Sequence, residues 1–343
     1  MPGSLADVAR RAGVSVATAS RALSGSRHPV SSVVRARIEQ AALEVGYAPS
    51  ALARALVTRR SRIIGVIVGD IVDPYFAEIT RGAEDVARRH GYMTIICNTD
   101  RTPVTELAYV RLLRDYQAEG IVFAGGGFDL AAGAHLPPEA AELDRTVDQA
   151  RTAGVRVISL AARSFPSTQV SVDNRAACYD VTSYATSLGH RRIAHVRGPA
   201  GLSTSAARLS GFQAAMSDAQ LDPSLVYEGD FDYESGQAAV TRMLGRQLPD
   251  AIIGANDESA IGVLMTLRQA GVRVPGDVSV AGIDDTRPSR FVDLTTVSVP
   301  MYELGALAAR RILERPRDAS DDRTVLPHRL VPRGTTARRE HPP

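Results

Sequence analysis

The sequence predicts an α/β protein with two parts: a small all-α N-terminal head, and a large body of two doubly wound parallel-sheet subdomains. Two observations predict this fold class. Three short stretches of helical periodicity fill residues 1–48, and beyond residue 62 short apolar runs alternate with helical patterns. The length of 343 residues and the hydrophobic content of 44% suit a globular chain with more than one domain.

The head contains three predicted helices. An apolar stripe recurs every three or four residues through 5–12, and Gly13 ends this helix. Ser15 is suited to cap a second helix over 16–23, and a third begins near residue 31 and stops at Gly46. Two short helices joined by a tight turn, followed by a third, are the helix-turn-helix arrangement. A generic three-helix bundle is the alternative.

Charge is divided unevenly along the chain. All 40 basic residues are arginine, and residues 1–62 contain ten of them against three acidic residues, about +7. Because the whole chain carries a net charge of +2, the remainder carries about −5. A basic head on a mildly acidic body indicates a polyanionic partner for the head. An arginine-rich face that is merely soluble is the alternative.

The segments DVARRAGVSVATASRAL and PVSSVVRARIEQAALEVGYAPSALARAL resemble the head of the lactose-repressor (LacI/GalR) family. The resemblance implies that the second helix lies in the major groove of double-stranded DNA, where Val16, Ala17 and Arg21 read bases. Arg21 can donate two hydrogen bonds to guanine. Phosphate contacts are implied for Ser15, Thr18, Ser20 and Ser31, with Arg35 supplying charge next to Val34, which stands where a hydroxyl residue is usual in the family.

The same resemblance makes residues 49–61 a hinge helix and linker that follow a DNA-binding domain over 1–48. Leu56 is then the apolar wedge inserted between base steps in the minor groove, and Arg54 approaches the adjacent backbone. An ordinary linker with an exposed leucine is the alternative.

Seven apolar runs in the body predict buried parallel strands, and a ligand is expected where their carboxyl ends converge. The runs are 63–68, 92–97, 121–124, 155–160, 193–196, 251–255 and 278–283.

Segments such as VDPYFAEI, ARLSGFQAA and GANDESAIG resemble, in order, the periplasmic-binding-protein-like core of the same family. The resemblance implies an effector-binding domain over 62–333, made of two interleaved subdomains joined by three crossovers. We expect the first at 62–161 with 290–317, the second at 162–289 with 318–333, and a tail at 334–343.

The resemblance also assigns effector contacts to the strand-end loops. An aromatic wall with an arginine and carboxylates suits a ligand rich in hydroxyl groups. The acidic residue that several sugar-binding relatives have near Ala161 is missing here. The loop from Gly125 to Pro138 is unusually long. The expected contacts are Tyr75, Phe76, Thr204, Arg208, Phe231, Asn256, Asp257 and Asp284, with a helix cap as the alternative role for Asp257.

These observations favour a cytoplasmic homodimeric transcription regulator that binds a near-palindromic operator and is controlled by a sugar or nucleoside. We expect no catalytic site, cofactor or metal: Gly125–Gly127 is not followed by the lysine of a phosphate loop, and Cys97 and Cys178 are the only cysteines. No apolar run is long enough for a membrane span. A sugar-binding protein of the periplasmic type without a regulatory role is the alternative.

Overall fold

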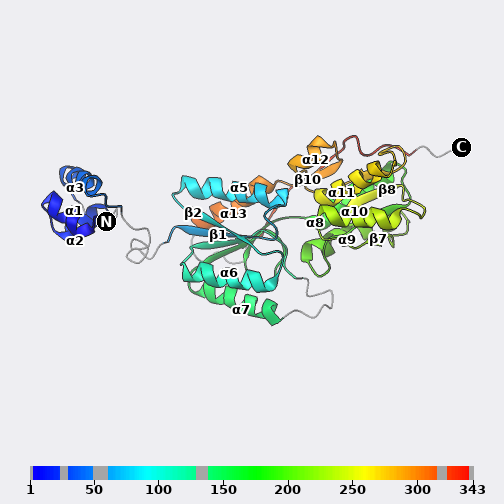
Figure 1. The fold of residues 1–343 in the computed structure, drawn as a ribbon. Helices are drawn as coiled ribbons and strands as arrows, with labels where there is room; N and C mark the ends of the chain where they lie inside the picture. Colours follow the sequence, from blue (N-terminus) through cyan, green and yellow to red (C-terminus); the bar gives the residue numbers. More distant parts are fainter. Residues whose placement is uncertain (1–2, 24–29, 49–60, 129–137, 315–322, 340–343) are drawn as a thin grey trace. The chain divides into compact units, whose positions relative to one another are not determined.

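The computed structural model describes residues 3–23, 30–48, 61–128, 138–314 and 323–339. The chain divides into two compact units, Met1–Arg62 and Ile63–Pro343, and each is described by itself (Figure 1). The predicted hinge contacts Arg54 and Leu56 lie outside the described residues, as does most of the long loop after Gly125.

The head unit contains the three predicted helices: α1 (Leu5–Ala12), α2 (Val16–Leu23) and α3 (Ser32–Glu44). Gly13 takes a left-handed conformation (φ 62°), which lets the chain turn sharply after α1. The Ser15 hydroxyl accepts a hydrogen bond from the Thr18 N–H at 3.1 Å, as predicted for a cap of α2. A small apolar core that includes Val8, Ala19 and Ile38 joins the three helices.

The first lobe of the body is built on a six-stranded parallel sheet in the order β11-β5-β4-β3-β1-β2. Helices α5 (Pro74–Arg89) and α13 (Met301–Glu314) cover one face, and α6 (Pro103–Asp115) and α7 (Pro138–Thr152) cover the other (Figure 1). The strands are β1 (Ile63–Val68), β2 (Met93–Asn98), β3 (Gly120–Phe123), β4 (Arg156–Ser159), β5 (Thr168–Val172) and β11 (Arg323–Leu326).

Apolar side chains of β1 point alternately to the two faces of this sheet, which explains why helices cover both faces. Ile64 and Val66 belong to the core on the side of α5 and α13, whereas Ile67 packs in the core under α6 and α7. Helices α5 and α13 cross closely at Gly82 and Gly305. A Cβ on Gly305 would lie 1.8 Å from the Ile79 carbonyl oxygen, so only glycine permits this approach.

The second lobe is built on a four-stranded parallel sheet in the order β7-β6-β8-β9, with α8 packed on α9 and α10 packed on α11. Strand β10 pairs antiparallel with β12, and bridges from Thr295 and Ser298 connect this ribbon to the segment of β9. The elements are β6 (Ile193–Val196), β7 (Val226–Tyr227), β8 (Ala251–Gly254), β9 (Ser279–Ala281), β10 (Thr296–Ser298), β12 (Arg329–Val331), α8 (Asn174–Ser187), α9 (Ser203–Asp218), α10 (Tyr233–Met243), α11 (Asp257–Gln269) and α12 (Arg287–Phe291).

The predicted division between the two subdomains is wrong at its crossovers. Residues 168–172 and 323–326 were assigned to the second subdomain, but they form β5 and β11 of the first sheet, where β5 pairs with β4 and β11 pairs with β5. Val170 and Val172 bury their side chains in the core of that sheet. Conversely, residues 296–298 were assigned to the first subdomain, but they form β10, which pairs with β12 and bridges to the segment of β9 in the second lobe. The predicted tail also packs in part: Thr335 is buried, and its hydroxyl donates to the Val280 carbonyl at 2.7 Å.

Among the described residues, no helix combines the length and the apolar character that crossing a bilayer requires.

Candidate functional site

The three predicted base-reading residues share the exposed face of α2. Val16, Ala17 and Arg21 are exposed, whereas Ala19 and Ala22 on the opposite face are buried in the head core. An exposed arginine next to small apolar side chains can enter a groove without a steric barrier. The structure therefore presents this helix in a way that suits direct contact with base edges.

Several of the residues expected to contact phosphates also make hydrogen bonds within the head. The Ser31 hydroxyl accepts from the Val34 N–H at the start of α3, and Ser15 and Thr18 share a hydrogen bond of 2.8 Å. Arg35 donates one hydrogen bond to the Ala22 carbonyl at 3.2 Å, at the end of α2. Because a guanidinium has five N–H donors, Arg35 can join α3 to α2 and still reach a phosphate. Ser20 is half-buried on α2.

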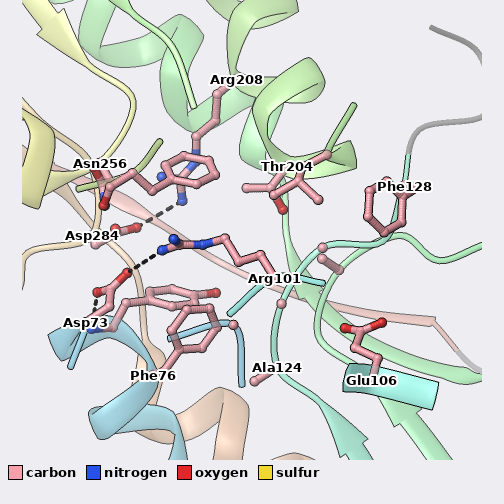
Figure 2. A pocket seen from close by; sticks show the side chains of 17 residues that line it. Asp73, Phe76, Arg101, Glu106, Ala124, Phe128, Thr204, Arg208, Asn256 and Asp284 are labelled. Atoms are coloured by element: carbon pink, nitrogen blue, oxygen red, sulfur yellow. Dashed lines mark hydrogen bonds and ion pairs between the residues drawn. The ribbon is translucent and has the colours of Figure 1, made fainter. Parts of the chain in front are cut away.

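In the body, the predicted effector residues other than Asp257 line one cavity at the carboxyl ends of the strands (Figure 2). Elements of both lobes contribute to it. The segments that follow β1, β2, β3 and β4 come from the first lobe, and those that follow β6, β7, β8 and β9 come from the second. The predicted residues that line it are Tyr75, Phe76, Thr204, Arg208, Phe231, Asn256 and Asp284.

Arg208 is the most heavily bonded side chain in this cavity. It is buried, and its guanidinium donates to Asn174 Oδ1 at 2.9 Å, to the Ala255 carbonyl, and to Asp284 Oδ1 at 2.9 Å. Its Cζ also lies 5.8 Å from the centre of the Phe231 ring. These contacts use three of the five N–H donors, so Arg208 is as much a scaffold for the cavity as a ligand contact.

Asn256 positions the aromatic residue Phe231. Its side-chain Nδ2 donates to the Phe231 carbonyl at 2.8 Å, while its Oδ1 caps α11 by accepting from the Ser259 N–H at 3.0 Å. Phe231 has φ 61°, a backbone conformation that residues other than glycine rarely adopt. The hydrogen bond from Asn256 helps to hold the Phe231 backbone in this conformation. The aromatic wall of the cavity is therefore held by a residue that was predicted to contact the ligand directly.

Asp257 does not belong to the cavity, which corrects the prediction. It is fully buried, and its two carboxylate oxygens accept hydrogen bonds from the Thr296 hydroxyl at 2.5 Å, the Thr286 N–H at 2.7 Å and the Thr286 hydroxyl at 3.1 Å. The alternative role as a helix cap is also wrong, since Asn256 caps α11. Asp257 instead ties the start of α11 to the crossover that leads into β10.

Among the polar cavity residues that the sequence analysis did not assign to the site are Asp73 and Arg101. Asp73 caps α5 by accepting from the Tyr75 N–H at 2.9 Å. Arg101 follows β2, and its Nη2 lies 3.9 Å from Asp73 Oδ2 (Figure 2). The rule that ligands bind beyond the carboxyl ends of parallel strands could have found both, since each comes a few residues after a predicted strand.

A buried ion pair supports the wall of the cavity formed after β3. Arg163 donates to both carboxylate oxygens of Glu106, at 2.8 and 3.0 Å, and to the Gly125 carbonyl at 2.8 Å. Its guanidinium lies 4.8 Å from the centre of the Phe123 ring. This arrangement fixes the glycine-rich loop. No acidic residue stands near Ala161, but a different carboxylate, that of Glu106, lines the cavity, and Arg163 neutralises its charge.

A backbone clasp joins the two lobes at the edge of the cavity. The Ser203 N–H donates to the Gly127 carbonyl at 2.8 Å, and the Ser203 hydroxyl donates to the Ala162 carbonyl at 3.0 Å. A bridge between Phe128 and Leu202 extends the same contact. Because Ser203 starts α9 in the second lobe, whereas Gly127 and Ala162 follow strands of the first, the clasp links the angle between the lobes to the shape of the cavity.

Burial changes the ionisation of the cavity carboxyls. It raises the pKa of Asp284 to about 8, although the neighbouring Arg208 charge acts in the opposite direction. It raises the pKa of Asp73 to about 6, with Arg101 opposing the shift. Burial also raises the pKa of the Tyr75 hydroxyl, which therefore stays protonated and can donate a hydrogen bond. The cavity offers hydrogen-bond donors and acceptors side by side.

A helix-turn-helix head with an exposed arginine, joined to a two-lobed α/β body with a polar cavity between its lobes, defines a class: DNA-binding transcription regulators with a ligand-binding domain. Comparison with known proteins gives the family. Residues 4–50 match the family described as "Bacterial regulatory proteins, lacI family", and residues 182–336 match "Periplasmic binding protein-like domain".

Similar proteins cover nearly the whole chain. Catabolite control protein A of Priestia megaterium is 32% identical over 342 residues, which are 96% of this chain and 98% of that protein. The HTH-type transcriptional repressor CytR of Escherichia coli (strain K12) is 33% identical over 338 residues, 96% of this chain and 95% of that protein. The chain belongs to the LacI family, and it is a DNA-binding transcription regulator rather than an enzyme.

Solved structures agree with this assignment. The Lac repressor dimer bound to operator and the anti-inducer ONPF has a TM-score of 0.83 at 25% identity, covering 98% of this chain and all of that one. The complex of the transcriptional regulator CelR with cellobiose has a TM-score of 0.69 at 27% identity and covers 97% and 99%. A LacI family regulator from Enterococcus faecium with bound ribose has a TM-score of 0.70 at 26% identity and covers 81% and 100%.

Proposed function

We propose that the protein is a cytoplasmic, homodimeric repressor that binds a near-palindromic operator, and that a sugar or nucleoside bound between the two lobes controls its affinity for that operator. The observation that carries the proposal is the cavity itself, because both lobes line it and the clasp at Ser203 joins them at its edge. The similar solved structures support it: one is a dimer on its operator, and others hold cellobiose or ribose.

The head would bind one half of the operator. Arg21 is proposed to read a guanine, with Val16 and Ala17 in apolar contact with neighbouring bases, for example a thymine methyl. Ser15, Thr18, Ser20, Ser31 and Arg35 are proposed to bind phosphates, which fix the register of the helix on the duplex. Two heads related by a two-fold axis require two half-sites, and this predicts the symmetry of the operator. Arg54 and Leu56 retain their predicted roles in the minor groove.

The body would act as the sensor. A ligand that contacts both lobes stabilises one angle between them over another, and the head receives this difference through the residues that connect it to the body. A coupling free energy of about 1–3 kcal/mol changes operator affinity by roughly one to two decades. Thr204 is the clearest direct contact, because its hydroxyl lies in the cavity on α9 and no hydrogen bond occupies it among the described residues.

DNA binding is tested by selecting an operator from a random-sequence duplex pool with the full-length protein, and then measuring the affinity of variants for it. Arg21→Ala should weaken binding at least about fivefold and relax the preference at one position, since a bidentate contact to guanine contributes about 1–3 kcal/mol. Leu56→Ala should weaken binding without changing the preferred sequence of the major groove. Arg268→Ala, at an exposed position of α11, is the control.

An unchanged operator affinity in Arg21→Ala would contradict the proposed base reader. Failure of the wild-type protein to enrich any sequence would favour the alternative, a sugar-binding protein without a regulatory role. For the sensor, Thr204→Val should reduce the stabilisation of the protein by its effector and leave operator affinity in the absence of effector unchanged. Melting temperatures report the first quantity, because a ligand that binds the folded state raises them.

A further inference from the structure

We infer that Asp73 and Arg101 together bind one hydroxyl group of a neutral, polyhydroxylated effector: the hydroxyl donates to Asp73 and accepts from Arg101. This inference rests on the proposed effector-binding role of the cavity and adds the chemistry of the ligand. Neither residue was expected at the site from the sequence.

The backbone directs Arg101 into the cavity. Asp100 and Arg101 have φ angles of 49° and 56°, two consecutive residues in the left-handed region that side chains other than glycine rarely adopt. The turn is held by a hydrogen bond of 2.9 Å from Asn98 Nδ2 to Asp100 Oδ1, and by another of 3.2 Å from the Arg101 N–H to the Gly69 carbonyl. Left-handed backbone conformations at two consecutive residues cost free energy. Their presence in this turn points to a role for the Arg101 side chain, which they orient.

The side-chain stem of Arg101 has a prepared surface to lie on. A Cβ on Gly69 would come within 3.1 Å of Arg101 Cγ and within 3.2 Å of Phe76 Cζ. Gly69 therefore leaves room for the methylene chain of Arg101 next to the Phe76 ring. Only 19% of the Arg101 side chain is exposed, and in Figure 2 it extends from its own turn toward Asp73. The guanidinium is thus placed by packing, and rotation of its stem is restricted.

The hydrogen-bonding capacity of Arg101 is unused in the part of the chain that the structure describes. Arg208 and Arg163, the other guanidiniums at the cavity, each make several hydrogen bonds. The Arg101 side chain makes an ion pair with Asp73, whose 3.9 Å separation is too long for a hydrogen bond, and its charge also acts on the nearby Asp230 carboxyl. On Asp73, Oδ1 accepts from the Tyr75 N–H, whereas Oδ2 faces Arg101.

The separation between these two groups fits a single oxygen atom. An oxygen at about 2.7–2.9 Å from both Asp73 Oδ2 and Arg101 Nη2 makes a hydrogen bond of ordinary length to each. A hydroxyl is the group that donates and accepts at once, so it satisfies the carboxylate and the guanidinium together. A water molecule or a ligand hydroxyl meets this requirement, and a ligand that displaces the water keeps both hydrogen bonds.

The charges around the cavity favour a neutral ligand. Its other carboxylates are already neutralised, Glu106 by Arg163 and Asp284 by Arg208. A phosphate or carboxylate on Arg101 would lie beside Asp73, and the like charges would repel. A hydroxyl brings no such repulsion. The pair therefore selects the neutral form of a sugar or nucleoside over its phosphorylated or oxidised derivative.

The test is a calorimetric titration of the full-length protein at pH 8, where Asp73 is ionised. The neutral probes are D-ribose, D-glucose, cellobiose, cytidine and adenosine, and the anionic probes are D-ribose 5-phosphate, D-glucose 6-phosphate and D-glucuronate. Arg101→Met keeps most of the stem that packs over Gly69 and removes the donors. Asp73→Asn keeps an oxygen that can cap α5 and removes the charge. Arg268→Met is the matched control, and unliganded melting curves check that every variant folds.

We expect a neutral probe to bind the wild type, Arg101→Met and Asp73→Asn each to weaken it at least tenfold, and the double variant to lose little more than either single variant. Additive losses would mean that the two residues contact different groups and would overturn the shared hydroxyl. Unchanged affinity in Arg101→Met overturns the inference while the proposed function stands. Tighter binding of an anionic probe than of its neutral parent overturns the neutral ligand. Binding of no probe to the wild type refutes the sugar or nucleoside effector itself.

Discussion

Replacing Asp257 by alanine should destabilise the body of the protein strongly, without removing a contact to the effector. The carboxylate is fully buried at the start of α11 and lies outside the cavity. It accepts three hydrogen bonds from Thr286, in the crossover between β9 and β10, and from Thr296, the first residue of β10. Alanine leaves all three donors without an acceptor in a site that water does not reach.

The size of the effect follows from those contacts. A hydrogen bond to a charged group contributes about 1.5–3 kcal/mol, and bonds that share one acceptor are not additive, so we expect a loss of about 3–5 kcal/mol. For a domain of this size, 1 kcal/mol moves the melting temperature by roughly 2–4 °C, so the shift should be at least about 6 °C. Thr296→Val removes a single donor and should give a smaller shift in the same direction.

The assay is thermal unfolding of the full-length variants followed by circular dichroism, combined with effector titration below the transition. Asp148→Ala is the matched control, because this exposed carboxylate on α7 is paired loosely with Arg151, 3.7 Å away, and its loss should leave the transition nearly unchanged. If Asp257→Ala melts like the wild type but no longer binds its effector, the structural role is refuted and the ligand contact predicted from the sequence is reinstated.

Two further predictions concern packing and pH. Gly305→Ala should destabilise the first lobe by about 1–3 kcal/mol because the new methyl group collides with Ile79, while Gly276→Ala, whose nearest neighbour would lie 3.4 Å away, should not; urea unfolding checks this. Burial lowers the pKa of His195 to about 4, so protonation favours the unfolded chain, and the contribution of His195 to stability should fall by roughly 3 kcal/mol from pH 6.5 to 4. His195→Phe should remove this part of the pH dependence; equal slopes in variant and wild type would contradict it.

The sequence predicted the fold class and most strands of the body because buried parallel strands read as continuous apolar runs. The run over 193–196 coincides with β6, and that over 63–68 with β1. Strands β5 and β11 were missed because polar residues interrupt them: they read TQVSV and RTVL. Their place at the end of the first sheet depends on pairing with residues far away in the chain, and local periodicity carries no information about such pairing.

Family resemblance located the cavity, but it did not reveal how each polar group is used. Arg208 and Asn256 were expected to bind the effector, and both also make several hydrogen bonds to the protein. Asp257 stands next to Asn256 in the chain, yet its side chain points into the interior. Arg101 was missed because its orientation results from two left-handed residues, Asp100 and Arg101, and neither of these is a glycine or an asparagine.

The return of the chain from the second lobe to the first has a consequence for synthesis on the ribosome. The first lobe is complete only when α13 covers Ile64 and Val66 and β11 has paired with β5, and the second lobe waits for Thr335 to reach Val280. The head, in contrast, is closed by its own core within the first 48 residues. A nascent chain therefore carries a finished DNA-reading unit long before either lobe can fold, and its unfinished sheets must be kept from aggregating until the last residues emerge.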